Sequence, residues 1–205
     1  MNSKPWILAA ALSFSLAVPS PARAELFAAL YAGGAFTQDG GVIVRTEALG
    51  LVGTADYSGS FTAGGRVGYW FGQGAPVGLA LDVSYFRPSE ELHVAPVSLL
   101  LFVRLPQPQE GWRPELYAGA GPGLFVSVLD IDLDPPVNQR YADVSADLGL
   151  DVRAGLAWKV SQVLAMFIEY RFTHVEPEFD DTVRGARVTT AGTLNTHSVL
   201  FGFRF

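Results

Sequence analysis

Cysteine is absent from the 205-residue chain, and after residue 24 there is no long hydrophobic run. Without cysteine the chain can form neither a disulfide nor a thiolate metal site. Without a run of ~20 apolar residues, the part beyond residue 24 offers no candidate for a membrane-spanning helix. Lysine is nearly absent too, since residues 25–205 contain only Lys159 and carry 12 basic against 20 acidic residues, a formal charge of −8. We therefore expect no nucleic-acid partner, because such binding needs clustered lysine and arginine.

The first 24 residues have the organisation of a secretory signal peptide. Lys4 precedes the apolar run Trp6–Val18, which is thirteen residues long and is followed by Pro19 and Pro21. This run is too short for a membrane-spanning helix, which takes ~20 residues. The small residues of Ala22-Arg23-Ala24 are typical of a cleavage site. We predict export, cleavage before Glu25, and a single mature domain over residues 25–205.

Apolar residues make up 49% of the chain and recur in short alternating segments. Alternation of this kind is typical of strands with one apolar face. Inside a bilayer every backbone N–H and C=O must be paired, so a closed barrel is the architecture that remains if the chain enters a membrane. We predict an all-β fold, an eight-stranded antiparallel transmembrane β-barrel, with strands at Leu26–Thr37, Phe61–Phe71, Val77–Phe86, Val94–Leu105, Glu115–Val128, Ser145–Trp158, Val163–Val175 and Thr193–Phe205.

The segment Phe61–Phe71 shows which face of the strands points inward. Its odd-numbered residues are mostly large and apolar, whereas its even-numbered face carries Arg66. A charge facing the middle of the lipid costs roughly 2–4 kcal/mol in such barrels, so the Arg66 face is predicted to line the lumen. Pro122 interrupts the fifth predicted strand, and because proline lacks a ladder donor we expect it at an edge or a bulge.

The predicted connections alternate in length. Short or proline-rich connections are expected at Gly72–Pro76, Pro106–Pro114 and Lys159–Gln162, and long polar loops at Gln38–Ser60, Asp130–Val144 and Glu176–Gly192, with Arg87–His93 as a shorter loop. Short periplasmic turns and longer extracellular loops are typical of outer membrane barrels, and they place both termini in the periplasm.

Charges provide a test of strand register, because antiparallel partners across a tight turn have residue numbers with a constant sum. A turn centred on Gly74 places Arg66 opposite Asp82. A turn centred on Ser161 places Arg153 opposite Glu169, Asp151 opposite Arg171, and Trp158 opposite Leu164 on the lipid side. We interpret the three ion pairs as structural, since an eight-stranded barrel is only wide enough for side chains to fill it.

Several segments resemble the small bacterial outer membrane β-barrel family of the OmpA/OmpX type: Pro96–Pro106, Leu116–Phe125, Glu169–His174 and the closing LFGFRF. The resemblance covers essentially all of Glu25–Phe205. It implies a monomer in the cell outer membrane, surrounded by membrane lipid and lipopolysaccharide. It also implies that the terminal strand, with Val199, Phe201, Phe203 and Phe205 on one face, is the signal read by the barrel-assembly machinery.

We expect a structural or loop-mediated binding role around a polar, largely plugged interior, without catalytic residues, cofactors or metal sites. A lipid A-modifying enzyme, a narrow porin-like channel and a soluble lipocalin-like barrel are the alternatives. His197-Ser198 is the tempting catalytic pair, but neighbours on a strand point to opposite faces. His174 is expected at the lipid-facing outer boundary, and His93 has no evident partner.

Asp130-Ile131-Asp132-Leu133-Asp134 resembles the opening of a calcium loop. It lacks the turn glycine, and Tyr141 occupies the position where a bidentate glutamate is expected. We therefore interpret these acidic residues as a solvated surface.

Overall fold

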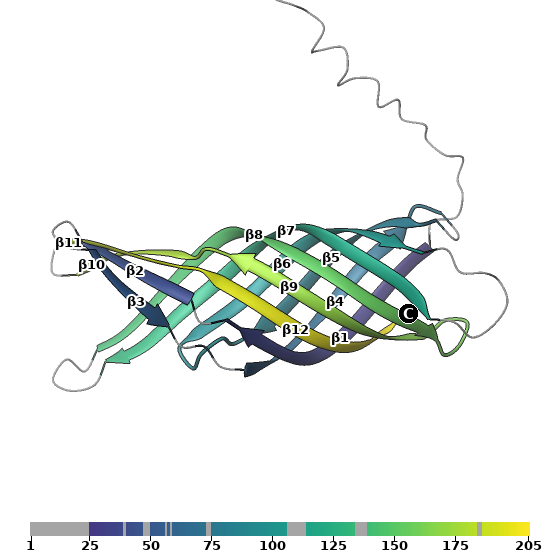
Figure 1. The fold of residues 1–205 in the computed structure, drawn as a ribbon, viewed down its shortest axis with the longest axis horizontal. Coiled ribbons are helices and arrows are strands. Elements are labelled where there is room, and N and C mark those ends of the chain that lie inside the picture. The colour runs from purple at the N-terminus through teal and green to yellow at the C-terminus, as the bar shows by residue number, and fades with distance from the viewer. Residues whose placement is uncertain are drawn as a thin grey trace, which may run out of the picture.

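The computed structural model describes residues 25–38, 40–46, 50–55, 57, 59–72, 75–105, 114–133, 139–183 and 186–205 (Figure 1). The predicted signal peptide and most of the predicted turn Pro106–Pro114 lie outside these residues. The described residues form twelve β-strands. Among them there is no helix of the length and apolarity needed to cross a membrane.

Eight of the strands form a closed antiparallel barrel, which confirms the predicted fold. β1 closes the barrel, because it pairs with β12 on one side and with β4 on the other. The strand order around the barrel is β1-β12-β9-β8-β7-β6-β5-β4. The strands are β1 (Glu25–Thr37), β4 (Gly59–Trp70), β5 (Val77–Phe86), β6 (Leu92–Arg104), β7 (Glu115–Leu133), β8 (Gln139–Lys159), β9 (Ala165–Val175) and β12 (Leu194–Arg204).

The other four strands form a second sheet that lies beyond one end of the barrel (Figure 1). Its order is β10-β11-β2-β3, with β2 (Gly40–Thr46), β3 (Gly50–Ala55), β10 (Glu178–Val183) and β11 (Ala186–Gly192). The predicted loops Gln38–Ser60 and Glu176–Gly192 are therefore largely strand. The predicted loop Asp130–Val144 is also partly wrong, because β7 and β8 stay paired as far as Leu133 and Gln139. Backbone pairing continues where the apolar alternation that marks a membrane strand has stopped.

The barrel wall alternates between exposed apolar and buried side chains, as predicted. Leu150 is 45% exposed and Phe201 is 61% exposed, whereas their strand neighbours Asp151 and Leu200 are fully buried. Both chain ends of the barrel lie at one end, which we call the terminal end, since Phe205 and Ala28 exchange backbone hydrogen bonds. The opposite end, which carries the four-stranded sheet, is called the sheet end.

The predicted register is right in one hairpin and wrong in another. Arg66 pairs with Asp82 in β4–β5, as the charges indicated. In β8–β9, however, Arg153 pairs with Arg171, and Trp158 pairs with Met166 rather than Leu164, so the prediction is shifted by two residues. Long arginine side chains reach carboxylates on diagonal positions of the neighbouring strand. The pattern of charges therefore does not distinguish two registers that differ by two residues.

Pro122 lies inside β7 and causes no bulge, in contrast to the prediction. The β6–β7 pairing keeps one offset on both sides of it, with Ser98 opposite Gly123 and Leu101 opposite Ala120. Only the two residues of each strand that lie between these pairs have no partner on the other strand. At the neighbouring Gly121 a Cβ atom would overlap the carbonyl oxygen of Leu99, so glycine permits the close backbone approach at this gap.

Candidate functional site in the barrel interior

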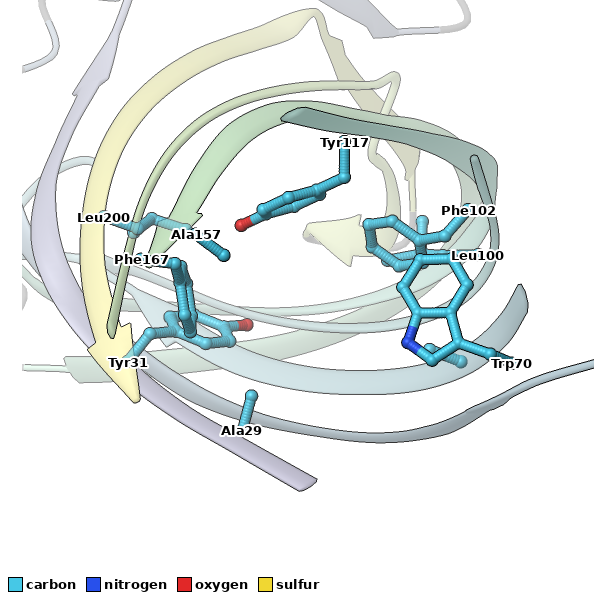
Figure 2. Close-up of a cluster of buried hydrophobic side chains, with 10 residues drawn as sticks. Ala29, Tyr31, Trp70, Leu100, Phe102, Tyr117, Ala157, Phe167 and Leu200 are labelled. Carbon is cyan, nitrogen blue, oxygen red and sulfur yellow. The ribbon is translucent and has the colours of Figure 1, made fainter. Parts of the chain in front are cut away.

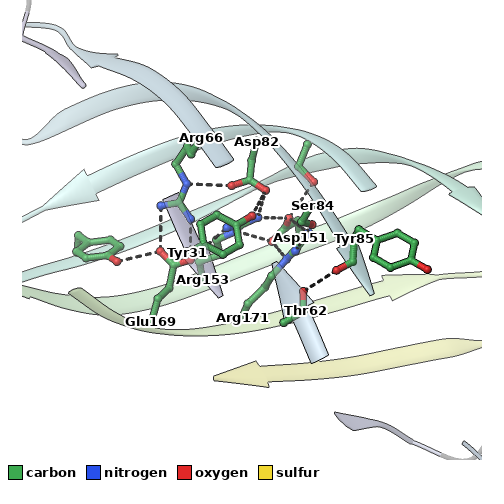
Figure 3. A network of polar contacts seen from close by, with 12 residues as sticks. Tyr31, Thr62, Arg66, Asp82, Ser84, Tyr85, Asp151, Arg153, Glu169 and Arg171 are labelled. Carbon is green, nitrogen blue, oxygen red and sulfur yellow. Dashed lines mark hydrogen bonds and ion pairs between the residues drawn. The ribbon is translucent and has the colours of Figure 1, made fainter. Parts of the chain in front are cut away.

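Six charged side chains meet in the middle of the lumen (Figure 3). They are Arg66 on β4, Asp82 on β5, Asp151 and Arg153 on β8, and Glu169 and Arg171 on β9; none is more than 5% exposed. We call these six the central network. Its three guanidinium groups balance its three carboxylates, as buried charges must be compensated to be tolerated.

Arg66 joins two walls of the barrel. Its Nε donates to Asp82 Oδ2 at 3.1 Å, which is the predicted ion pair. Its two terminal nitrogens donate to Glu169 at 3.0 and 2.6 Å, in the bidentate geometry that gives strong, directional pairs. The contact between Arg66 and Glu169 runs between β4 and β9, which are not neighbours in the barrel wall.

Arg153 lies at the centre of the central network. It donates to Asp82 at 2.6 Å, to Asp151 at 2.9 Å and to Glu169 at 3.1 Å. Arg171 donates to Asp151 at 2.8 Å and to Ser84 at 2.6 Å. The Arg153–Glu169 and Asp151–Arg171 contacts therefore occur, although the residues are not directly opposite each other, and Asp151 holds the two facing arginines together.

Neutral hydroxyl groups complete the shell around the carboxylates. Tyr31 donates to Asp82 at 2.7 Å, Tyr117 donates to Glu169 at 2.9 Å, and Ser98 donates to Asp151 at 2.8 Å. Sequence reasoning missed these residues together with Ser84. The available signal was their inward position on the strands, but the contacts themselves depend on which strands face one another across the lumen.

Apolar side chains fill the lumen on both sides of the central network. Along β9, Phe167 precedes Glu169 and Arg171, and Val175 follows them. An apolar layer, the central network and a second apolar layer therefore follow one another along the barrel. The cluster toward the terminal end contains Tyr31, Trp70, Leu100, Phe102, Tyr117, Phe167 and Leu200 (Figure 2). The cluster toward the sheet end, called the outer apolar cluster, contains Ala35, Phe86, Leu92, Val94, Phe125, Val175, Phe179 and Leu194, with Tyr57 and Leu129 against it.

A second set of ion pairs closes the terminal end. Arg104 donates to Glu25 at 2.8 Å and lies 3.5 Å from Glu115, and Arg204 donates to Glu115 at 2.8 Å. The Arg104 guanidinium also lies 4.2 Å from the centre of the Trp70 ring, a cation–π contact. Sequence reasoning did not identify these ion pairs.

Every carboxylate of the central network is held by at least one arginine, so none of these three carboxylates is a free base. In the described part of the chain no group of three or more histidines and acidic residues is placed to hold a metal ion. The side chains of Asp130–Asp134 lie outside the described residues. Within the described residues, the interior contains these paired charges between two apolar clusters.

The histidines lie on the outer wall. His197 exchanges a hydrogen bond with the Tyr170 hydroxyl at 2.5 Å, while Ser198 is buried on the lumen side, so the two do not form a nucleophile–base pair. His174 contacts Asn195 at 2.7 Å. The expectation that His93 has no partner is wrong, because it contacts the Tyr85 hydroxyl at 2.5 Å.

Solved structures provide the comparison with known proteins. No protein-family model matches the chain, and no curated protein matches it in sequence. The outer membrane protein OprG from Pseudomonas aeruginosa is 12% identical over 88% of this chain and 96% of that chain, with a TM-score of 0.60. Neisserial surface protein A is 14% identical over 88% of this chain and 97% of that chain, with a TM-score of 0.56. The chain has the small outer membrane barrel fold. This likeness confirms the architecture for which the OmpA/OmpX-type resemblance was drawn.

Proposed function

We propose that this chain is an integral protein of the bacterial outer membrane with a structural or loop-mediated binding role. One observation carries the proposal: the barrel is apolar outside and charged inside. Large apolar side chains are exposed on all eight barrel strands, whereas the paired charges of the central network are buried. A water-soluble barrel would have the opposite arrangement, and contiguous exposed apolar surface of this extent needs lipid to cover it.

Orientation and export form the next part of the proposal. The terminal end faces the periplasm and the four-stranded sheet faces outward, since long structured connections are extracellular in such barrels. Residues 1–24 serve as the signal peptide, because Lys4, the apolar run Trp6–Val18 and the triplet Ala22-Arg23-Ala24 have that organisation. The partners are then outer membrane lipid and lipopolysaccharide around a monomeric barrel.

The closing strand supports assembly by the barrel-assembly machinery. Val199, Phe201, Phe203 and Phe205 all have exposed side chains on the outer face. β12 also forms the final seam of the barrel, because it pairs with both β1 and β9. This exposed, largely aromatic face of the strand that pairs with β1 is a suitable binding surface for an assembly factor.

Membrane fractionation combined with gel mobility tests the proposal. We expect the chain in the outer membrane fraction, migrating as a compact form on SDS gels until it is boiled. Recovery in the soluble periplasmic fraction would contradict it. Single-channel recording addresses the narrow-pore alternative and should show no steady conductance, and mass spectrometry of lipid A should show no change that depends on the chain.

A further inference from the structure

The outer wall of the barrel is hollowed over β8, β9 and β12, which are neighbours in the wall (Figure 1). One hollow has a volume of about 620 Å³, and the next has a volume of about 370 Å³. Ile168 of β9 lines both of them, so the two adjoin, and together we call them the wall groove. The large outward side chains along the wall groove include Leu156, Trp158, Met166, Tyr170 and Phe201.

Small residues of β8 make room for the wall groove. Ala154 lines its smaller hollow and lies directly opposite Tyr170 of β9, so no long side chain extends outward from β8 at that point. The side chains that border the groove are apolar and uncovered, since Met166 is 47% exposed and Phe201 is 61% exposed. In a membrane, a hydrocarbon chain of a lipid is the group that covers such a surface.

At the terminal end the wall groove reaches a polar hollow of about 250 Å³. Lys159, which ends β8, lines both the wall groove and this polar hollow. Ser161 and Gln162, in the turn after β8, also line the polar hollow. Trp158 precedes the lysine, and tryptophan at the end of a membrane strand is typical of the level of the lipid headgroups. The site is therefore apolar along the wall and polar at the membrane boundary, and Lys159 joins its two parts.

Lys159 is the cation of this site that has no anionic partner. Glu25 and Arg204 also line the polar hollow, but Glu25 is paired with Arg104 and Arg204 is paired with Glu115. Among the described residues Lys159 forms no ion pair, and it is exposed. Lysine binds phosphate groups as a point charge. An unpaired lysine at the end of an apolar groove fits a ligand that carries both a phosphate and a hydrocarbon chain.

We propose that the wall groove and Lys159 bind one anionic phospholipid of the periplasmic leaflet, and this proposal rests on the membrane location and orientation proposed above. An acyl chain of the lipid lies in the wall groove, and its phosphate lies beside Lys159. Residues 25–205 carry a formal charge of −8, which repels anionic headgroups from the barrel as a whole. Selection of an anionic lipid therefore needs a local cation, and Lys159 is the only lysine in these residues.

Another hollow of similar size shows what distinguishes this site. It has a volume of about 590 Å³ and is lined by apolar residues of β1, β4 and β5 that include Leu26, Val67 and Leu79. Among the described residues that line it there is no lysine, arginine or histidine. This hollow accepts the hydrocarbon chain of any lipid, so we expect no preference among headgroups there. The comparison assigns the selection of the headgroup to Lys159.

Quenching of Trp158 fluorescence by phospholipids with brominated acyl chains tests the proposal. Residues 25–205 with Trp70→Phe and Trp112→Phe keep Trp158 as their one tryptophan. This chain is reconstituted into phosphatidylcholine vesicles that contain a minor fraction of brominated lipid, either phosphatidylglycerol or phosphatidylcholine. We expect brominated phosphatidylglycerol to reach the same quenching at about a fivefold lower fraction, which is the factor for one basic residue near an anionic lipid.

Three variants in the same background identify the residue responsible. Lys159→Gln should abolish the preference for phosphatidylglycerol, and Lys159→Arg should keep it because the charge remains. Arg87→Gln is the matched control, since it removes one positive charge at the sheet end and should keep the full preference. Heat-dependent gel mobility is measured on each preparation to show that the barrel has folded.

Three results would overturn the inference: equal quenching by the two lipids without a change at Lys159, a preference that survives Lys159→Gln, or a preference that Arg87→Gln removes. Vesicles made entirely of brominated phosphatidylcholine separate this failure from that of the proposed function. If these vesicles do not quench Trp158, the barrel is not in the membrane and the proposed location fails as well. If they quench it and no headgroup is preferred, only the phospholipid site fails.

Discussion

Replacing Arg66 by methionine tests the role of the central network, because it removes one charge and retains much of the side-chain volume. Arg66 provides three hydrogen bonds, one to Asp82 and two to Glu169. In Arg66→Met both carboxylates keep Arg153 as a partner, but two guanidinium groups then face three buried carboxylates. Removing one partner of a buried ion pair typically costs about 3–5 kcal/mol.

The expected result is a free energy of unfolding lower by about 3–5 kcal/mol in Arg66→Met. For a domain of this size each 1 kcal/mol corresponds to roughly 2–4 °C, so the loss corresponds to roughly 6–20 °C in Tm. The assay is urea unfolding in detergent, followed by tryptophan fluorescence, alongside the temperature at which the compact form is lost on SDS gels.

Two further variants make this measurement decisive. Arg66→Met combined with Glu169→Gln restores a neutral interior, so it should be less destabilised than the sum of the two single changes. Arg87→Gln removes an arginine whose hydrogen bond is made to the Glu90 carbonyl at an exposed loop, and its effect should stay within about 0.5 kcal/mol. If Arg66→Met is as stable as Arg87→Gln, the network does not brace the barrel.

Three other predictions follow from the wall, the closing strand and the filled lumen. Gly121→Val should lower the yield of heat-modifiable barrel, because its Cβ would overlap the Leu99 carbonyl. The control Gly192→Ala should fold normally, because no atom lies within 4 Å of the added Cβ. Equal yields of the two variants would contradict the packing. Deleting Phe205 should reduce the amount of protein in the outer membrane fraction, measured by immunoblot, since this removes both the exposed terminal ring and the backbone bonds to Ala28; an unchanged amount would argue against the assembly signal. Liposomes containing the wild-type barrel should retain entrapped small sugars as well as protein-free liposomes do, and rapid release would show an open lumen.

The sequence predicted the barrel because its strongest signal is local. Alternation along each strand, with Arg66 deciding the inward face, gave eight strands that all overlap the observed ones. Their ends were less well predicted, since β7 and β8 continue beyond the region where apolar residues alternate. The strands β2, β3, β10 and β11 were taken as polar loops. The hairpins β2–β3 and β10–β11 are local, but the pairing of β11 with β2, which joins them into one sheet, brings together segments that are distant in sequence.

The central network was predicted only in part. Charges on neighbouring strands indicated three pairs, but the contacts from Arg66 to Glu169 and from Arg153 to Asp82 link strands that are not adjacent in the barrel wall. Such contacts exist only after closure of the barrel. Single-strand patterns therefore identify inward charges without identifying their partners.

The most direct test of the membrane-inserted barrel uses the absence of native cysteine, which allows single spin labels to be attached. Four variants, Ser198→Cys, Val199→Cys, Leu200→Cys and Phe201→Cys, are labelled in outer membranes, and the collision rate of each label with oxygen and with an aqueous nickel complex is measured. The account predicts high oxygen and low nickel accessibility at positions 199 and 201, and low values for both reagents at 198 and 200. High nickel accessibility at 199 and 201, or no alternation, would contradict it.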